Sequence, residues 1–275
     1  MSVPIALTIA GSDPSGGAGV QADLKTFSAL GAYGTAVLTA LTAQNTRGVT
    51  GVHLVPAAFV TEQLRTLVAD VRIDTIKIGM LATAELAEAV GAFLAGYRCD
   101  CVVLDPVMVA TSGDRLLAED AVEAVRRLLP RADLITPNLP EAAHLLGDAP
   151  ATDVAGMRAQ AQRLLEAGAR RVLLKGGHLA RSGGPQLPAV DVLAGPEGVR
   201  ELAADRVATA NTHGTGCTLS SAVAALRPQR PGWPEAVADA KTWLTRAIEA
   251  ADGLGVGSGN GPVHHFHATW PSALA

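Results

Sequence analysis

The sequence is poor in aromatic residues and cysteines, and it has no long uncharged apolar run and no block of basic residues. Aromatic residues make up 3% of its 275 residues, and its three cysteines cannot all pair within one chain. Nothing in it points to secretion, so we expect reduced thiols and a cytoplasmic location. The lack of a long apolar run disfavours a membrane-spanning helix. A net charge of −4 without a basic block disfavours nucleic acid and anionic membranes as main partners.

What the sequence does contain is apolar residues, at 48%, and 29 glycines. This length and apolar content suffice for a substantial core. No internal repeat and no segment typical of an interdomain linker is present. We therefore expect residues 1–275 to form a single domain.

Strand and helix patterns alternate along most of the chain. The strand-like segments are short and continuously apolar, which is typical of an α/β fold with a mostly parallel sheet covered by helices on both faces. Two segments that flank Gly195–Gly198 predict an antiparallel hairpin at one edge of the sheet. The predicted strands are 4–10, 35–43, 75–78, 101–104, 133–135, 171–174, 191–193 and 199–202. The predicted helices are 15–31, 57–71, 83–95, 118–129, 140–146, 153–167, 215–226 and 234–251.

Polar and glycine-rich clusters follow six of the predicted strands. In open parallel sheets, ligands bind beyond the carboxyl ends of the strands. We therefore expect these clusters to contribute to one common site. They are residues 11–16, 44–47, 79–80, 105–114, 136–141 and 175–178.

The segment Asn211–Ser221 has the sequence N-T-H-G-T-G-C-T-L-S-S and precedes an alanine-rich apolar helix. Gly214 and Gly216 allow a tight turn and a close approach of the backbone to a ligand. Unpaired N–H groups and the positive end of the helix dipole favour an anion there, most obviously a phosphate. Cys217 lies in this turn, and a helix N-terminus is expected to lower the pKa of its thiol. The alternative is a buried cysteine behind a helix-capping turn.

Two carboxylates and one lysine stand at other strand ends. Asp105 ends an apolar strand and Glu141 opens a helix, and carboxylates at such positions can hold Mg²⁺ beside substrate phosphates. Lys175, in K-G-G-H, can place an ammonium beside a phosphate. Each residue also has an ordinary explanation: a turn-forming Asp-Pro, a helix cap and a solvated lysine.

Two further patterns are weaker. Residues 11–16, G-S-D-P-S-G, match the first half of a P-loop, but Gly17-Ala18 replace the required Lys and Ser/Thr. A Walker-type nucleoside triphosphatase is therefore disfavoured. The histidines at 264, 265 and 267 lack a partner at metal-binding spacing, and we interpret them as part of a structural tail.

Seven segments of the chain form a recognisable combination. They are, in order, G-S-D-P-S-G-G-A-G-V-Q-A-D-L-K-T, T-A-Q-N-T-R-G-V, K-I-G-M-L, A-T-S-G-D, T-P-N-L-P-E-A, K-G-G-H and N-T-H-G-T-G-C-T-L-S. Together they resemble the hydroxymethylpyrimidine and hydroxymethylpyrimidine-phosphate kinases of thiamine synthesis, which belong to the ribokinase-like superfamily. The resemblance extends over essentially the whole chain, including the closing G-P-V-H-H-F-H.

The resemblance implies a homodimeric, ATP- and Mg²⁺-dependent kinase. Its substrates would be the hydroxymethyl group of 4-amino-5-hydroxymethyl-2-methylpyrimidine and then the resulting monophosphate. Cys217 takes the position of the catalytic base, and Gly214, Thr215 and Gly216 form with it the anion hole for the phosphoryl group. Because a thiolate beside phosphates suffers like-charge repulsion, we expect Cys217 to be mostly thiol at rest.

The resemblance also implies the binding residues. Asp23 and Gln44 would hydrogen-bond to the aminopyrimidine, and their chemistry suits this, since Gln44 donates and accepts while Asp23 accepts from the exocyclic amine. The rest of the pyrimidine pocket would be Gly11, Met80 and Val107, with residues 110–116 as a flap. The nucleotide side would be Asn138, Lys175 and Thr209, and the magnesium residues would be Asp105, Thr136 and Glu141.

Other functions fit parts of this pattern. A vitamin B6 kinase on the same fold would phosphorylate a similar hydroxymethyl group. Cys217 with His213 or His178 would suit a thiol hydrolase or acyltransferase. A pyrimidine-binding regulator would bind the same ligand without forming ADP.

Overall fold

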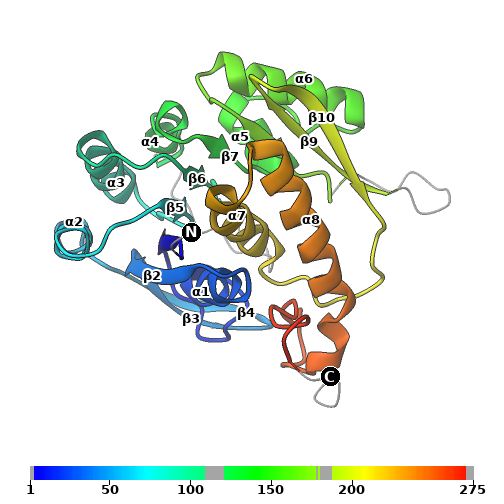
Figure 1. The fold of residues 1–275 in the computed structure, drawn as a ribbon, viewed down its shortest axis with the longest axis horizontal. Helices are drawn as coiled ribbons and strands as arrows, with labels where there is room; N and C mark the ends of the chain where they lie inside the picture. Colours follow the sequence, from blue (N-terminus) through cyan, green and yellow to red (C-terminus); the bar gives the residue numbers. More distant parts are fainter. Residues whose placement is uncertain (1–2, 109–120, 178, 180–187, 271–275) are drawn as a thin grey trace.

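The computed structural model describes residues 3–108, 121–177, 179 and 188–270. These residues form a central sheet of eight strands in the order β10-β9-β8-β7-β6-β5-β1-β2 (Figure 1). The strands are β1 Ile5–Ala10, β2 Tyr33–Leu38, β5 Thr75–Ile78, β6 Val102–Leu104, β7 Leu134–Ile135, β8 Val172–Leu174, β9 Ala189–Gly195 and β10 Gly198–Ala204.

The sheet is parallel from β2 to β8 and antiparallel at the edge formed by β9 and β10. Strands β5, β6, β7 and β8 are buried along their whole length, as expected for a sheet covered on both faces. The predicted mostly parallel sheet with an antiparallel edge hairpin is confirmed.

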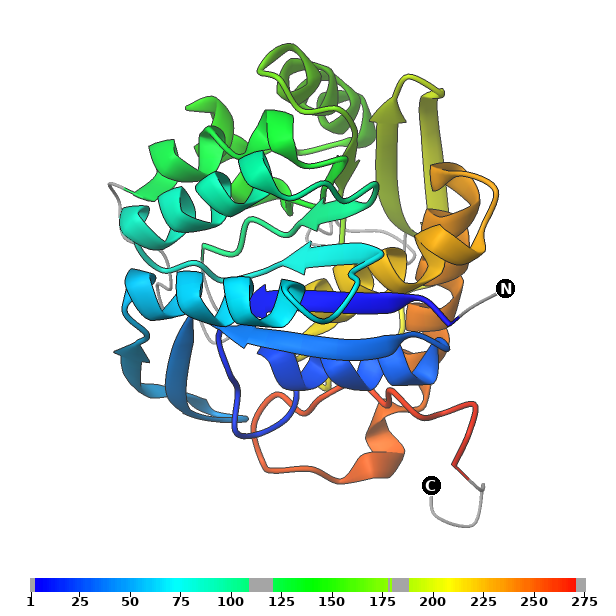
Figure 2. The same ribbon diagram turned by 60° about the vertical axis from the view of Figure 1, so that its left-hand side comes forward.

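Helices lie on both faces of the sheet (Figures 1 and 2). Because alternate side chains of a strand point to opposite faces, Leu104 packs with α2–α6 while Val103 packs with α1, α7 and α8. The helices are α1 Gly19–Ala29, α2 Ala57–Val68, α3 Ala84–Gly96, α4 Ala121–Arg126, α5 Leu139–Leu146, α6 Val154–Glu166, α7 Thr215–Leu226 and α8 Trp233–Glu249, with short 3₁₀ turns η1 Leu129–Arg131, η2 Arg227–Gln229 and η3 Ala251–Leu254. No helix in the described ranges is both long and apolar enough to span a membrane.

A small second sheet was not predicted. It consists of β3, Ala40–Asn45, and β4, Gly48–Leu54, paired antiparallel. The single strand predicted over 35–43 is wrong, because the chain divides at Thr39 between β2 and β3. The buried hydroxyl of Thr39 donates to the carbonyl oxygen of Met80 at 2.7 Å, and its N–H donates to that of Ala10 at 3.0 Å. These bonds hold the chain at the end of β1 and direct β3 away from the main sheet.

The parallel strands end at one edge of the sheet, as predicted from the polar clusters. The segments that follow β1, β5, β6, β7 and β8 therefore lie close together. The first turn of α7 reaches the same place, since a Cβ on Gly216 would lie within 4 Å of side-chain atoms of both Asp105 and Lys175. This edge of the sheet is the candidate site.

Candidate active site

The start of α7 packs directly against the loop that follows β1. Gly214, the residue before the helix, has a φ of 77°, and a Cβ there would lie 1.7 Å from the carbonyl oxygen of Gly17. A Cβ on Gly17 would in turn lie 2.3 Å from Cδ2 of His213. Both positions therefore require glycine, and the two glycine-rich segments meet backbone to backbone. This contact brings the N-termini of α1 and α7 together.

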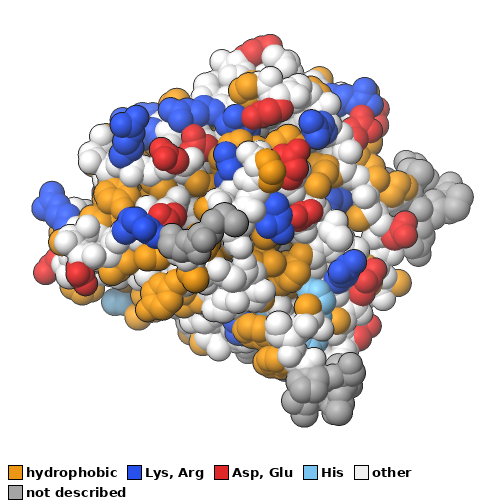
Figure 3. Space-filling model, in the orientation of Figure 1, with side chains coloured by type: hydrophobic (Ala, Val, Ile, Leu, Met, Phe, Trp, Pro, Cys, Tyr) orange, Lys and Arg blue, Asp and Glu red, His pale blue; other side chains and the backbone are white. Residues whose placement is uncertain are grey.

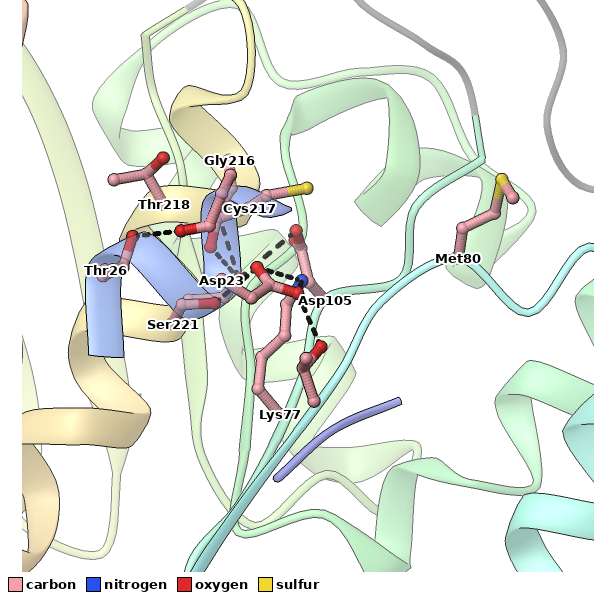
Figure 4. A network of polar contacts seen from close by, with 12 residues as sticks. Asp23, Thr26, Lys77, Met80, Asp105, Gly216, Cys217, Thr218 and Ser221 are labelled. Atoms are coloured by element: carbon pink, nitrogen blue, oxygen red, sulfur yellow. Dashed lines mark hydrogen bonds and ion pairs between the residues drawn. The ribbon is translucent and has the colours of Figure 1, made fainter. Parts of the chain in front are cut away.

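Cys217 lies in the first turn of α7 and is partly exposed (Figure 4). Burial raises the pKa of its thiol to about 11; Lys77 and an N–H bond from Gly19 oppose this, while Asp23 and Asp105 add to it. The expectation that the helix N-terminus lowers this pKa is wrong, because desolvation outweighs the helix dipole. The raised pKa agrees with the expectation of a thiol at rest.

Asp105 and Lys175 form an ion pair beside this turn. The Lys175 Nζ lies 2.8 Å from Asp105 Oδ1, and the hydroxyl of Thr136 donates to the same oxygen at 3.0 Å. A Cβ on Gly216 would lie 3.2 Å from the Lys175 Nζ, so the backbone of the turn faces the pair. Burial opposes ionisation of Asp105, but Lys175 and Lys77 hold its pKa below the ordinary value. Negative and positive charge thus stand side by side at the helix N-terminus.

Glu141 and Asn138 form a capping box at the start of α5. The Asn138 side chain accepts from the N–H of Glu141 at 2.9 Å, and the Glu141 carboxylate accepts from the N–H of Asn138 at 2.8 Å. Glu141 is therefore a helix cap, as the ordinary explanation held. Burial raises its pKa to about 7, with Lys175 opposing and Asp105 adding to the shift.

The oxygen donors around Asp105 suit a divalent cation. Asp105, Glu141 and Thr136 supply two buried carboxylates and a hydroxyl, the ligand types that Mg²⁺ takes beside phosphates. Burial and the neighbouring Asp105 raise the pKa of Glu141, while Lys175 opposes the rise. A bound cation would stabilise the charged form of this carboxylate.

Of the residues predicted for the pyrimidine, Gly11 and Met80 meet, while Gln44 and Val107 are partly exposed. Gly11 and Met80 are in contact, since a Cβ on Gly11 would lie 2.5 Å from the Met80 Cε. Gln44 extends from β3 beside a bulge, is partly exposed and accepts from the hydroxyl of Thr42 at 3.1 Å. Val107 follows Asp105 after β6 and is also partly exposed.

Asp23 does not lie with them. Its side chain is fully buried in α1, and its carboxylate accepts from the Lys77 ammonium at 2.9 Å and from the hydroxyls of Thr8 and Ser221 at 2.6 Å each (Figure 4). No oxygen of this carboxylate is left for a substrate amine. The predicted contact between Asp23 and the pyrimidine is wrong, because the partners that enclose it come from β1, β5 and α7.

Comparisons with known proteins show the family of this chain. The sequence model of the phosphomethylpyrimidine kinase family matches residues 13–264. A hydroxymethylpyrimidine/phosphomethylpyrimidine kinase of Escherichia coli strain K12 is 56% identical over 266 residues, which are 96% of this chain and 98% of the relative. This chain belongs to the phosphomethylpyrimidine kinase family.

Solved structures of related kinases confirm the predicted ribokinase-like fold. An ADP complex of Bacillus subtilis pyridoxal kinase superimposes with a TM-score of 0.88 at 35% identity and covers 98% of this chain and 100% of its own. A phosphomethylpyrimidine kinase from Clostridium difficile 630 superimposes with a TM-score of 0.77 at 39% identity, covering 89% of this chain and 99% of its own. The family and the fold expected from the seven motifs are therefore both confirmed.

One buried pair in this kinase fold was missed by sequence reasoning. The Asp13 carboxylate accepts from the N–H groups of Ser15, Gly17 and Ala18 and lies 2.8 Å from the His213 Nε2. Burial opposes its ionisation, but the bonds from His213 and Ser15 lower the pKa of Asp13 to about 2. The pair joins the two glycine-rich segments. The signal in the sequence was one acidic residue, Asp13, in the first segment and one histidine, His213, in the second.

Other predicted residues lie elsewhere. Thr209 bonds through its hydroxyl to Asp252 and accepts from the N–H of Asn211 at 3.0 Å, so its place on the nucleotide side stays a prediction. The flap over 110–116 and His178 lie outside the described residues. His265 is buried and lies 3.1 Å from the hydroxyl of Thr218 in α7.

We expect Gly214→Ala to destabilise the protein more than Gly198→Ala. Both glycines have positive φ, and an L-residue there costs about 1–2 kcal/mol. A Cβ on Gly198 meets no described atom within 4 Å, whereas the clash of Gly214→Ala with Gly17 adds roughly 1–3 kcal/mol. Urea unfolding followed by circular dichroism measures both losses. Equal losses would contradict the backbone contact between the two segments.

We expect Asp13→Asn to lower the free energy of unfolding by about 2 kcal/mol at neutral pH, since the pKa falls from 3.8 to about 2 on folding. A lowered pKa in the folded state stabilises above the unfolded value and is lost as the pH falls through the folded one. The difference between wild type and variant should therefore shrink to roughly 1 kcal/mol near pH 3. A difference that stays constant in unfolding measurements from neutral pH to about pH 3 would show that Asp13 ionisation does not stabilise the fold.

Proposed function

We propose that this protein is one kinase domain, which transfers the γ-phosphoryl group of ATP to the hydroxymethyl group of 4-amino-5-hydroxymethyl-2-methylpyrimidine and then to the resulting monophosphate. The observation that carries the proposal is the placement of the first turn of α7, with Cys217, directly against the Asp105–Lys175 pair. The names of the relatives and the ADP in one related structure support it.

The triphosphate has several groups to contact in this arrangement. The free N–H groups of Gly216 and Cys217 and the helix dipole stabilise negative charge on the transferring phosphoryl group. The ammonium of Lys175 lies next to this turn and adds a positive charge. Asp105, Thr136 and Glu141 would hold Mg²⁺, which would neutralise charge on the leaving phosphates.

The pyrimidine would enter between β3 and the ends of β5 and β6. Gln44 donates and accepts hydrogen bonds, which matches the edge of an aminopyrimidine. Gly11 lets Met80 approach closely, and Val107 donates its N–H to the carbonyl oxygen of Asp105 at 2.8 Å. The acceptor hydroxymethyl would then point toward Cys217.

Cys217 would accept the proton of this alcohol. The thiol is the resting form, so only the small thiolate fraction acts as a base, and that fraction grows tenfold per pH unit below its pKa of about 11. Phosphoryl transfer depends more on alignment and charge stabilisation than on full deprotonation of the alcohol. Proton transfer to Cys217 is thus late in the reaction.

We expect Cys217→Ala to lower kcat for the pyrimidine by roughly 10²-fold or more, the contribution of a positioned base, with little change in KM. The wild-type kcat should rise between about pH 6 and 9, whereas the variant should be nearly independent of pH. ADP release in the presence of MgATP and the pyrimidine measures both. Unchanged turnover in the variant would agree with the kinase function but would show that Cys217 is not the catalytic base.

The same assay with pyridoxine tests the alternative vitamin B6 kinase, which the structural similarity to pyridoxal kinase favours. We expect a higher kcat/KM for the pyrimidine. A preference for pyridoxine would reverse the substrate assignment. If neither alcohol leads to ADP release, the thiol hydrolase or acyltransferase and the pyrimidine-binding regulator remain as the candidate functions.

A homodimer is the assembly that the family resemblance implies, and the β3–β4 sheet is its best candidate contact. A two-stranded sheet is only marginally stable alone, and this one exposes Leu41, Val52 and Leu54 at 47%, 48% and 43%.

On the face seen in Figure 3, basic and acidic side chains are intermixed, so that face offers no basic field for nucleic acid. The cytoplasmic location stays a prediction.

We expect the double variant Leu41→Lys/Val52→Lys to sediment as a monomer, because burying two ammonium groups opposes association. Phe59→Lys is the matched control, since Phe59 is 54% exposed but lies on α2 outside the sheet. Analytical ultracentrifugation distinguishes the species. A dimer that persists in the double variant would place the contact elsewhere.

A further inference from the structure

One buried ion pair has no part in the reaction as proposed. Lys77, on β5, and Asp23, on α1, both have side chains with no exposed surface. The Lys77 Nζ lies 2.9 Å from each carboxylate oxygen of Asp23 (Figure 4). Removing two charges from water is costly, and a well-packed apolar pair is often as stable as a buried ion pair. Stability alone therefore does not explain a lysine at this position.

The pair lies one helical turn behind Cys217. The Asp23 carboxylate accepts from the hydroxyl of Ser221 on α7, four residues after Cys217. Residues four apart lie on the same face of a helix, so Ser221 connects the pair to the face that carries the thiol. The side chain of Lys77 also packs tightly against Gly79, since a Cβ on Gly79 would lie 2.9 Å from the Lys77 Nζ.

The charge of Lys77 is permanent. Burial opposes it, but Asp23 and the other negative groups nearby raise the pKa of Lys77 above its ordinary value. The charged groups that act on Cys217 are Lys77, Asp23, Asp105 and Lys175. Among them the effect of Lys77 on the thiol exceeds the opposite effect of Asp23, so the pair as a whole favours negative charge at Cys217.

We propose that Lys77 is a positioning residue of the kinase: held by Asp23, its ammonium supplies a fixed positive charge behind Cys217 and the first turn of α7, where negative charge gathers during phosphoryl transfer. This inference rests on the proposed kinase function. Asp23 acts as the holder of Lys77 and not as a contact of the pyrimidine. Ser221 connects the pair to α7 through one hydrogen bond.

The test is the double variant Lys77→Gln/Asp23→Asn. It removes both charges, keeps one oxygen that can accept from Thr8 or from Ser221, and lets the two amides bond to each other. We expect iodoacetamide to alkylate Cys217 about tenfold more slowly near pH 8, as for a rise of one unit in the thiol pKa. Peptide mass spectrometry separates Cys217 from Cys99 and Cys101, and the assay needs neither ATP nor pyrimidine.

The kinetic expectation is a fall in kcat of roughly tenfold with KM for the pyrimidine nearly unchanged, because charge behind the turn acts on the transition state. Wild-type rates of alkylation and turnover in a folded double variant would overturn the proposal. If this variant does not fold, Lys77→Met/Asp23→Asn is measured in the same way. Absence of ADP formation by the wild type would refute the kinase function but leave the alkylation result intact.

Two controls separate charge from structure. Lys241→Met/Asp191→Asn neutralises another buried pair, with a distance of 2.6 Å between Lys241 and Asp191, and is expected to change stability but not the alkylation of Cys217. Ser221→Ala keeps the ion pair but removes its hydrogen bond to α7. In this variant iodoacetamide is expected to alkylate Cys217 at the wild-type rate. If Ser221→Ala behaves like the double variant, the pair acts by holding the helix and the charge proposal is wrong.

Discussion

The close contact between Gly214 and Gly17 is the constraint on which the site depends. Two backbone segments, each at the start of a helix, meet at a distance that no side chain can share. The N-termini of both helices then lie at one small region, and the Asp13–His213 pair joins the two segments. Without this contact the sheet would still form, but the start of α7 would not reach Asp105 and Lys175.

The charged side chains around this region form two ion pairs and leave one further carboxylate. Lys77 is fully buried and Lys175 is partly buried, and Asp23 and Asp105 are their two partners. Glu141 is the carboxylate left over, and burial raises its pKa to about 7. Such a site can bind a cation together with a negatively charged triphosphate. These are the ligands that the proposed function requires.

A helix N-terminus is commonly expected to lower the pKa of a cysteine thiol, and desolvation outweighs this effect at Cys217. Burial raises the pKa of the Cys217 thiol to about 11; Lys77 opposes this rise, and Asp23 and Asp105 add to it. A thiol that is protonated at rest agrees with the proposed role of a base that accepts a proton late in phosphoryl transfer.

Sequence alone determined the features that depend on local chemistry. Apolar runs predicted the strands, Gly195–Gly198 predicted the edge hairpin, and the N-T-H-G-T-G-C segment predicted a helix that starts after a glycine turn. The tertiary structure decided whatever depends on partners far apart in the chain. Asp23 meets Lys77 54 residues away, and Asp13 meets His213 200 residues away. The bend at Thr39 needs Met80, 41 residues away. A buried carboxylate takes its role from the donors that surround it, and which donors those are is fixed only when the strands and helices pack.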